Sequence, residues 1–360
     1  MTRPELFEKV RAILETAKTG AARSVNTAQV AAYWLIGREI VEEEQKGRRR
    51  AEYGKGILRA LSVRLTAEYG RGFSFQNLAF IRQFFLRFPD LLPEKRIVYA
   101  LRRELGEHFG QPQATGAWCP GQLHPNLSWA HYKALLKVED VSSRAFYEIE
   151  AIKNNWTGRE LERQINSLLY ERLAKSKDKA GLLSLATKGH QVQKPADIFK
   201  DPTVIEFLGL PESPRLVESD LEQALIDNLR GFLLELGKGF AFLARQERLT
   251  LDGDHFYVDL VFYHVILKCY VLIDLKVGKL THQDLGQMQL YVNWFDKERR
   301  AGGDGPTLGL ILCTDKNDAV VRYTLGDAQP NIFASRYRLH LPSDEELKAR
   351  IRKELLALRR

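Results

Sequence analysis

Residues 255–263, HFYVDLVFY, and residues 268–276, KCYVLIDLK, decide the fold of this chain. Both stretches are dominated by aliphatic and aromatic residues, and a short connection joins them, which predicts two neighbouring buried strands. Asp259 lies at the centre of the first strand, and the second ends on Asp274 and Lys276. Successive side chains of a strand point to opposite faces, so Asp274 and Lys276 should share a face and Leu275 should point away. Charged groups in such apolar runs are costly unless they are paired or bind a metal, so these residues predict a site.

The residue types suit a magnesium site that acts on phosphate esters. Mg²⁺ prefers carboxylate and carbonyl oxygens and keeps several waters, so Asp259, Asp274 and the backbone carbonyl of Leu275 are predicted ligands, and Mn²⁺ should substitute. A bound metal would lower the pKa of a water and stabilise negative charge on the phosphate. Lys276 would position the attacking water and balance charge. Burial lowers a lysine pKa, which would also allow it to transfer a proton.

A bare D…DxK pattern arises by chance in many chains, so a second explanation stays open. In that explanation Asp274 forms a strand-end salt bridge with Lys276 or a neighbour, and Asp259 caps a turn. Under the first explanation the pattern is the core of a PD-(D/E)xK nuclease.

Three neighbouring features favour the nuclease explanation. The helix predicted over 281–298 carries Gln287 and Tyr291, which are four residues apart and therefore share a helix face. An amphipathic helix with acidic first turns is predicted over 218–229, and a fully apolar strand over 307–314. The order helix–strand–strand–strand–helix–strand predicts an α/β restriction-endonuclease-like core (αβββαβ).

With these motifs the chain resembles the YhcG family of bacterial proteins over most of its length. The stretches that carry the resemblance in the second half are GFLLELGKGFAF (231–242), FYVDLVFYH (256–264), GQM (286–288) and GLILC (309–313). Those in the first half are YWLIG (33–37), GRGFS (70–74) and NNW (154–156).

The resemblance implies a PD-(D/E)xK phosphodiesterase domain behind a family-specific N-terminal domain. By motif it makes Asp259, Asp274 and Lys276 the catalytic residues and Glu222 the acid contributed by the preceding helix. Gln287 and Tyr291 would be the family's Q…Y extension. Val258 stands where the motif name has proline, and Asp274 stands where glutamate is commoner; both variants are tolerated in the superfamily.

Composition is compatible with a soluble two-domain protein that binds nucleic acid. The 360 residues are 44% hydrophobic and 28% charged, as in globular proteins. The net charge of +8 suits a polyanionic partner. Three cysteines without CxxC spacing indicate a reducing, cytoplasmic location. No apolar run reaches the roughly 18 residues of a membrane span, and the first residues do not resemble a signal peptide.

The first half of the sequence predicts an all-α domain that resembles a helix-turn-helix. Residues 70–73, GRGF, interrupt a helical pattern, and Ser74 can cap a further helix over 75–88. Two helices joined by such a turn are typical of DNA-binding proteins. The predicted nucleic-acid contacts are Arg71, Gln76, Asn77, Arg82 and Gln83. An ordinary helical hairpin whose polar face meets water explains the pattern equally well.

We therefore expect four regions. Residues 1–175 form the helical domain, 176–215 a linker, 216–342 the nuclease domain, and 343–360 a C-terminal helix. The strand over 332–341 is expected at the edge of the sheet.

The function predicted from the sequence is a Mg²⁺-dependent endonuclease that hydrolyses DNA while the N-terminal domain engages the substrate. A homodimer would supply one site for each strand of a duplex. Two alternatives remain. One is a non-catalytic nucleic-acid-binding or assembly protein on the same scaffold. The other is a nuclease whose substrate is RNA or branched DNA, because the same residues would serve any of these substrates.

Overall fold

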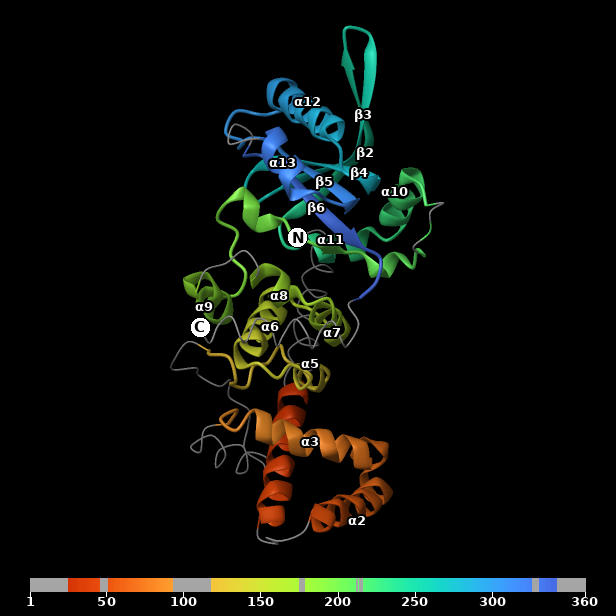
Figure 1. Cartoon of the computed structure of the whole chain (residues 1–360). Helices are drawn as coiled ribbons and strands as arrows, with labels where there is room; N and C mark the ends of the chain where they lie inside the picture. The colour runs from red at the N-terminus through yellow and green to blue at the C-terminus, as the bar shows by residue number, and fades with distance from the viewer. Residues whose placement is uncertain are drawn as a thin grey trace, which may run out of the picture. The chain divides into compact units, whose positions relative to one another are not determined.

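The computed structural model describes residues 25–45, 51–92, 118–174, 179–211, 213, 216–325 and 330–341 (Figure 1). The chain divides into two compact units, Met1–Ile165 with Lys179–Gly189, and Asn166–Asp178 with His190–Arg360. The C-terminal helix predicted over 343–360 lies outside the described residues. None of the helices within the described ranges is both long and apolar enough to cross a lipid bilayer.

The described part of the first unit is helical, as the sequence predicts. Its helices are residues 25–45, α2 (Ala51–Tyr69), η1 (Arg71–Phe73), α3 (Phe75–Arg87), α5 (Trp129–Leu135), α6 (Val141–Lys153), α7 (Gly158–Asn166) and α9 (Lys179–Lys188). Ser74 caps α3 by accepting a hydrogen bond of 3.3 Å from the backbone N–H of Asn77. Aromatic rings form much of this unit's core: Phe84 packs against Trp129 and Tyr132 with ring centroids 5.3 and 4.8 Å apart.

The second unit is built on one mixed sheet in the order β1-β6-β5-β4-β3-β2. Its strands are β1 (Thr203–Val204), β2 (Phe240–Leu251), β3 (Asp254–His264), β4 (Cys269–Lys279), β5 (Leu308–Asp315) and β6 (Ile332–Arg338). Its helices are α8 (Leu169–Ala174), η2 (Pro195–Ile198), η3 (Glu206–Leu208), α10 (Glu218–Asp227), α11 (Leu229–Leu236), α12 (His282–Glu298) and α13 (Asp318–Leu325). The pairs β2–β3 and β3–β4 are antiparallel, whereas β4–β5, β5–β6 and β6–β1 are parallel.

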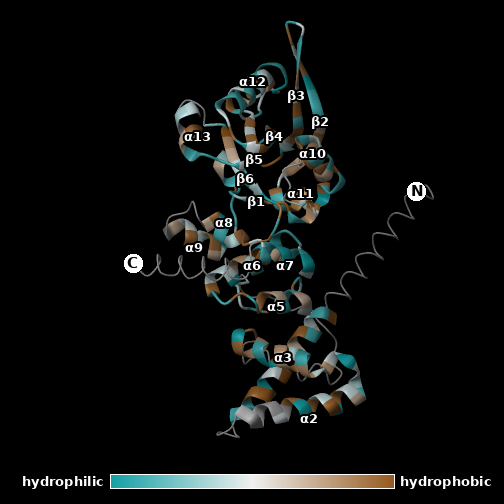
Figure 2. Ribbon diagram, turned by 45° about the vertical axis from the view of Figure 1, so that its right-hand side comes forward, coloured by the Kyte–Doolittle hydropathy of each residue, from teal (hydrophilic) through white to brown (hydrophobic). Residues whose placement is uncertain are grey.

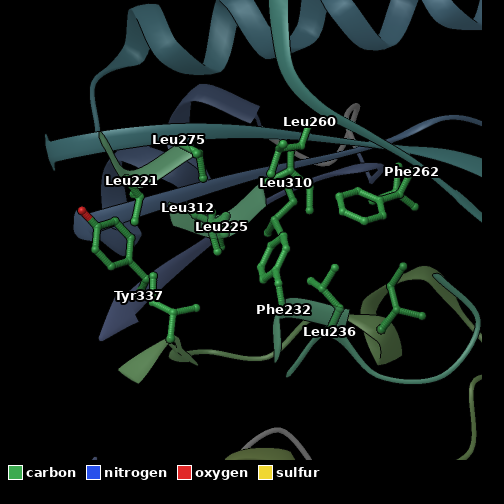
Figure 3. Close-up of a cluster of buried hydrophobic side chains, with 14 of the residues drawn as sticks. Leu221, Leu225, Phe232, Leu236, Leu260, Phe262, Leu275, Leu310, Leu312 and Tyr337 are labelled. Atoms are coloured by element: carbon green, nitrogen blue, oxygen red, sulfur yellow. The ribbon is translucent and has the colours of Figure 1, made fainter. Parts of the chain in front are cut away.

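Apolar side chains cover both faces of this sheet, which is why its central strands read as nearly continuous hydrophobic runs. Figure 2 shows these hydrophobic segments in brown on the strands at the centre of the sheet. On one face α10 and α11 pack Leu221 and Phe232 against strand residues that include Leu275 (Figure 3). On the other face α12 packs Met288 against a cluster that includes Leu272. A Cβ atom on Gly309 of β5 would lie 2.5 Å from Met288 Sδ, so any larger residue there would force the Met288 side chain to move.

One expectation about the end of the sheet needs correction. β6 is not an edge strand, because it lies between β5 and β1, where Thr203 pairs with Tyr337 and Val204 with Arg338. The segment predicted as the linker, 176–215, supplies β1 as well as α9. A two-residue strand has no periodic pattern that sequence inspection can detect.

A buried ionic cluster attaches α8 to the sheet. The guanidinium of Arg172 forms a salt bridge with Glu235 of α11, and both side chains are almost completely inaccessible. Arg172 also donates to the Pro202 carbonyl at 3.0 Å and to Ser167 Oγ at 3.1 Å. Glu235 accepts a further hydrogen bond of 3.0 Å from the backbone N–H of Val204 in β1. The polar groups of both residues are thus largely satisfied, as buried charges require.

Candidate active site

The first component of the candidate site lies where β3 and β4 separate. Their ladder ends at the pair Leu260–Ile273. Immediately beyond it, the Asp259 carboxylate on β3 accepts a hydrogen bond of 2.8 Å from the backbone N–H of Leu275 on β4. The N–H and C=O of one strand residue point to the same neighbour. The Leu275 carbonyl therefore faces the same side as Asp259, where its predicted ligand role requires it to be.

Asp274 and Lys276 share one face of β4, as strand alternation predicts. Lys276 Nζ lies 2.9 Å from Asp274 Oδ2, while Leu275 belongs to the core cluster on the opposite face. Lys276 also lies 3.9 Å from a carboxylate oxygen of Glu218 on α10. The salt bridge of the second explanation is therefore present. Asp259, however, does not cap a turn; its carboxylate bridges two strands.

Burial raises the pKa values of Asp259 and Asp274, and the negative charge of a neighbouring carboxylate contributes to each shift. The pKa of Asp274 is raised to about 7, chiefly by burial and next by the negative charge of Asp259, although Lys276 acts in the opposite direction. The pKa of Asp259 is also raised, chiefly by burial, although the Leu275 N–H, Lys276 and Gln246 each lower it. Asp274 Oδ2 is buried and makes a charge contact with Lys276, but it receives no well-directed hydrogen bond from the described residues.

Lys276 differs from the expectation that burial would lower its pKa. Burial alone does act in that direction, but the carboxylates of Asp274, Glu218 and Asp259 outweigh it, so the pKa is raised. Lys276 is therefore held as a cation, which favours an electrostatic role over proton transfer.

Glu222 of α10 is connected to the cluster by Gln246, a residue that the sequence analysis did not identify. The side-chain amide of Gln246 on β2 donates to Glu222 at 2.5 Å and to Asp259 at 3.0 Å. Glu222 is buried, and Arg245 Nε lies 3.2 Å from its other oxygen. One amide nitrogen thus connects the acid of α10 with the acid of β3.

The backbone at Gln246 is irregular, and this irregularity places its side chain. Gln246 has φ of 46°, in the left-handed region that non-glycine residues seldom adopt. The β2–β3 register passes from Arg245–Leu260 to Glu247–Val258 without including it. On the partner strand Val258 and Leu260 belong to core clusters on opposite faces of the sheet. The regular alternation of side chains between the faces is therefore interrupted at Asp259 as well. The only hint in the sequence is the polar triplet 245–247 within an otherwise apolar strand.

Gln287 and Tyr291 face the cluster from α12. Gln287 Nε2 donates to the Tyr291 hydroxyl at 2.5 Å, as their four-residue spacing permits. Tyr291 is fully buried. Burial raises the pKa of Tyr291, and the negative charge of Asp274 raises it further, which shows that Asp274 lies within electrostatic range of this hydroxyl.

The donor set fits a hard divalent cation that retains water. Within the described residues no three His, Cys, Asp or Glu side chains converge to form a complete metal cage. Mg²⁺ does not require one, since it commonly binds one or two carboxylates together with waters and substrate phosphates. Asp259, Asp274 and the Leu275 carbonyl are oxygen donors of the kind that such a site uses.

The five nucleic-acid contacts predicted in the first unit divide into two groups. Asn77 and Arg82 are engaged internally. Asn77 donates to the Gly72 carbonyl at 2.6 Å and accepts from Trp129 Nε1 at 3.2 Å, while Arg82 pairs with Glu44 at 2.6 Å. Arg71 and Gln76 are exposed, and Gln83 is half-buried.

Known proteins resemble both halves of the chain. Residues 196–353 match the family model described as YhcG PDDEXK nuclease domain, and residues 9–172 match the DUF1016 N-terminal domain. The chain is 37% identical over 351 residues to "Putative nuclease YhcG" of Escherichia coli (strain K12), covering 95% of this chain and 92% of that protein.

Solved structures are similar over a smaller part. A repair endonuclease from Pyrococcus abyssi has 18% identity and a TM-score of 0.25, and an EndoMS–dsDNA2 complex has 14% identity and a TM-score of 0.26. Each match covers 37% of this chain and 50% of the other, and similarity of this extent carries no argument about function. The family model and the relative from Escherichia coli show the family. This chain belongs to the YhcG family, and its second unit carries that family's PD-(D/E)xK nuclease domain.

Proposed function

We propose that this protein is a Mg²⁺-dependent endonuclease that hydrolyses phosphodiester bonds of DNA. The observation that carries the proposal is the cluster of Asp259, Asp274 and Lys276 where β3 and β4 separate, with both carboxyl pKa values raised. Buried acids in this state bind a divalent cation readily, and a fixed lysine beside them suits a negatively charged ester.

Asp259 and Asp274 would hold the metal, together with the Leu275 carbonyl. When bound, Mg²⁺ would lower the pKa of a water and stabilise negative charge that develops on the phosphate. Mn²⁺ should support the same chemistry, because it accepts the same oxygen ligands.

The remaining residues orient these groups. Lys276, kept protonated by its neighbours, would hold a phosphate oxygen or the attacking water by a charged hydrogen bond. Gln246 and Glu222 would fix the orientation of Asp259. Because the Tyr291 oxygen accepts from Gln287, the hydroxyl proton of Tyr291 remains available to donate toward Asp274.

The helical unit would engage DNA through its exposed polar residues, of which Arg71 and Gln76 are the strongest candidates. The net charge of +8 agrees with a polyanionic substrate. A homodimer would allow both strands of a duplex to be cut. The described cysteines are free, which agrees with a reducing cytoplasm.

The test is a cleavage assay on supercoiled plasmid, linear duplex, a four-way junction and a single-stranded RNA. Each substrate is incubated with Mg²⁺, Mn²⁺ or EDTA. Wild type is compared with Asp274→Ala and with Asp220→Ala, which removes an exposed acid from the same domain. We expect metal-dependent cutting of DNA by wild type and Asp220→Ala, with none by Asp274→Ala. Cutting that persists in Asp274→Ala would reject the site. DNA binding without cutting would favour the non-catalytic scaffold, and preferential cutting of RNA or the junction would correct the substrate.

A further inference from the structure

The β2–β3 hairpin extends well beyond the part of the sheet that β4 supports. β2 and β3 remain paired out to Leu251 and Asp254, at the turn. β4 pairs with β3 only from Leu260 to His264. The outer part of the hairpin therefore projects from the sheet, as Figure 1 shows. Its base is the segment that carries Asp259 and Gln246.

The two faces of this projection differ in what covers them. One face carries Leu249 and Val258, which belong to the core cluster of α12, and Glu247, which pairs with Arg299 at 2.6 Å. This face is therefore occupied by the protein itself.

The opposite face, which we call the hairpin face, consists of two cross-strand pairs. Arg248 is paired with Tyr257, and Thr250 with His255. All four residues are exposed, with Tyr257 at 47%. The next residues inward on the two strands are Gln246 and Asp259, whose side chains are joined by a hydrogen bond of 3.0 Å. The hairpin face is thus continuous with the candidate active site.

The chemistry of the hairpin face favours an anion. Arg248 has no ion-pair partner among the described residues, and no carboxylate lies on this face before Asp259. Thr250 Oγ1 lies 3.1 Å from His255 Nδ1, which fixes the ring and leaves its Nε2 for an external partner. Of the acids of the hairpin, Glu247 and Asp254 belong by register to the other face, and Asp252 lies in the turn. Arginine, tyrosine, threonine and histidine together form a row of hydrogen-bond donors.

The spacing of these donors matches a phosphate backbone. At about 3.3 Å per residue, Tyr257 lies roughly 7 Å and His255 roughly 13 Å along the strand from Asp259. A duplex rises about 3.4 Å per base pair, so with the strand laid along the duplex axis the two positions would correspond to about two and four base pairs from the scissile bond.

We propose that the hairpin face docks the sugar-phosphate backbone of duplex DNA on one side of the bond that is cut. This inference rests on the proposed function and specifies how the substrate is held. Backbone contact is favoured because arginine, threonine and tyrosine are among the donors that bind phosphate oxygens, which accept most protein–DNA hydrogen bonds. A duplex is favoured over a single strand because stacking platforms for single strands use several aromatic rings, and this face has one tyrosine.

The test measures binding by fluorescence anisotropy with a labelled 30-base-pair duplex, in EDTA so that metal-dependent cutting cannot interfere, between 50 and 200 mM salt. The variants are Arg248→Ala and Arg248→Ala/Tyr257→Phe. Arg299→Ala is the matched control, because it removes the same charge from a residue that contacts the opposite side of the hairpin through Glu247.

We expect Arg248→Ala to weaken binding about five- to tenfold and to reduce the salt slope by about 0.9, the contribution of one phosphate contact. The double variant should bind more weakly still, and the control should stay close to wild type.

Parallel cleavage assays separate this inference from the proposed function. If wild type cuts DNA but the hairpin variants bind like Arg299→Ala, the hairpin face does not dock DNA and the nuclease assignment stands. If wild type binds through the hairpin without cutting, the hairpin face is supported and the nuclease assignment fails. Equal loss of affinity for duplex and single strand would overturn the duplex assignment, and no DNA binding by wild type would overturn both proposals.

Discussion

Gln246 on β2 and Asp259 on β3 are joined by a hydrogen bond of 3.0 Å between the Gln246 amide nitrogen and Asp259 Oδ1. The same nitrogen donates to Glu222, so the orientation of Asp259 depends on a residue that would not itself bind a metal. Partners of this kind fix the direction in which a ligand presents its oxygen.

Replacing Gln246 with glycine should therefore impair activity without unfolding the protein. Glycine adopts the observed φ of 46° without strain. We expect turnover or metal affinity to fall about 10- to 100-fold, with a melting temperature within a few degrees of wild type. Plasmid nicking and Mn²⁺ calorimetry measure the two effects. Glu247→Gln, at the next residue and on the opposite face, is the control. A Gln246→Gly variant with wild-type metal affinity and turnover would show that Gln246 has no positioning role.

Metal affinity should rise with pH across neutrality. The pKa of Asp274 is raised to about 7, chiefly by burial, so a proton must leave before a metal binds at pH values below 7. Apparent Mn²⁺ affinity should increase by up to about tenfold per pH unit below pH 7 and level off above it. Calorimetric titrations at pH 6, 7 and 8 would show this, and a flat profile would contradict the shift.

The same shift predicts that metal-free Asp274→Asn is more stable than wild type at high pH. Because the folded state binds the Asp274 proton more tightly than the unfolded state, the free energy of unfolding falls as pH rises from about 4 to about 7 and is then constant. The full difference of about three pKa units, which already includes the opposing effect of Lys276, corresponds to at most about 4 kcal/mol. Urea unfolding in EDTA should show a gain for Asp274→Asn at pH 8 and little difference at pH 4. A variant less stable at pH 8 would refute the argument.

Lys276→Met should separate turnover from metal binding. Lysine is a cation here and not a ligand, so we expect turnover to fall by about 10²- to 10³-fold, as for other fixed charges that stabilise an anionic transition state. Metal should still bind, but over a higher pH range, because Lys276 lowers the pKa of Asp274 in wild type. Lys279→Met, at an exposed position three residues further along β4, is the control. Loss of metal binding at every pH would instead indicate a structural role.

Breaking the Arg172–Glu235 pair should destabilise the second unit. Glu235→Ala leaves a buried guanidinium without its counter-charge and removes the acceptor for the Val204 N–H, so a cost of about 3–5 kcal/mol is expected. The double variant Arg172→Met/Glu235→Leu should recover much of that loss, because it removes both charges of the pair together. Urea denaturation followed by near-UV circular dichroism measures both. Equal loss in the single and double variants would argue that packing rather than charge is responsible.

The sequence alone predicted the positions of site residues wherever side chains follow the regular alternation of a strand or the period of a helix. Alternation along β4 was sufficient to place Asp274 and Lys276 together and Leu275 opposite. Gln246 could not be found this way, because its left-handed backbone interrupts the alternation that such an argument needs.

Long-range pairing limited the prediction in the helical unit. Asn77 and Arg82 lie on a polar helix face, but their partners Trp129 and Glu44 are 52 and 38 residues away. A polar residue that faces water and one that pairs with a distant partner look alike in sequence. The family resemblance predicted the restriction-endonuclease-like core for a different reason, since it depends on whole matched stretches and not on single side chains.

The short strand β1 determines where the nuclease unit can be separated from the rest of the chain. A fragment beginning at residue 216, the domain start expected from sequence, would lack β1. The backbone of β6 would then be an unpaired edge, which promotes aggregation by pairing with another molecule. A fragment beginning at residue 196 would restore β1 but omit Arg172, leaving Glu235 without its counter-ion. A fragment that keeps both β1 and this ion pair must therefore include Arg172, which lies at the end of the stretch that matches the N-terminal domain.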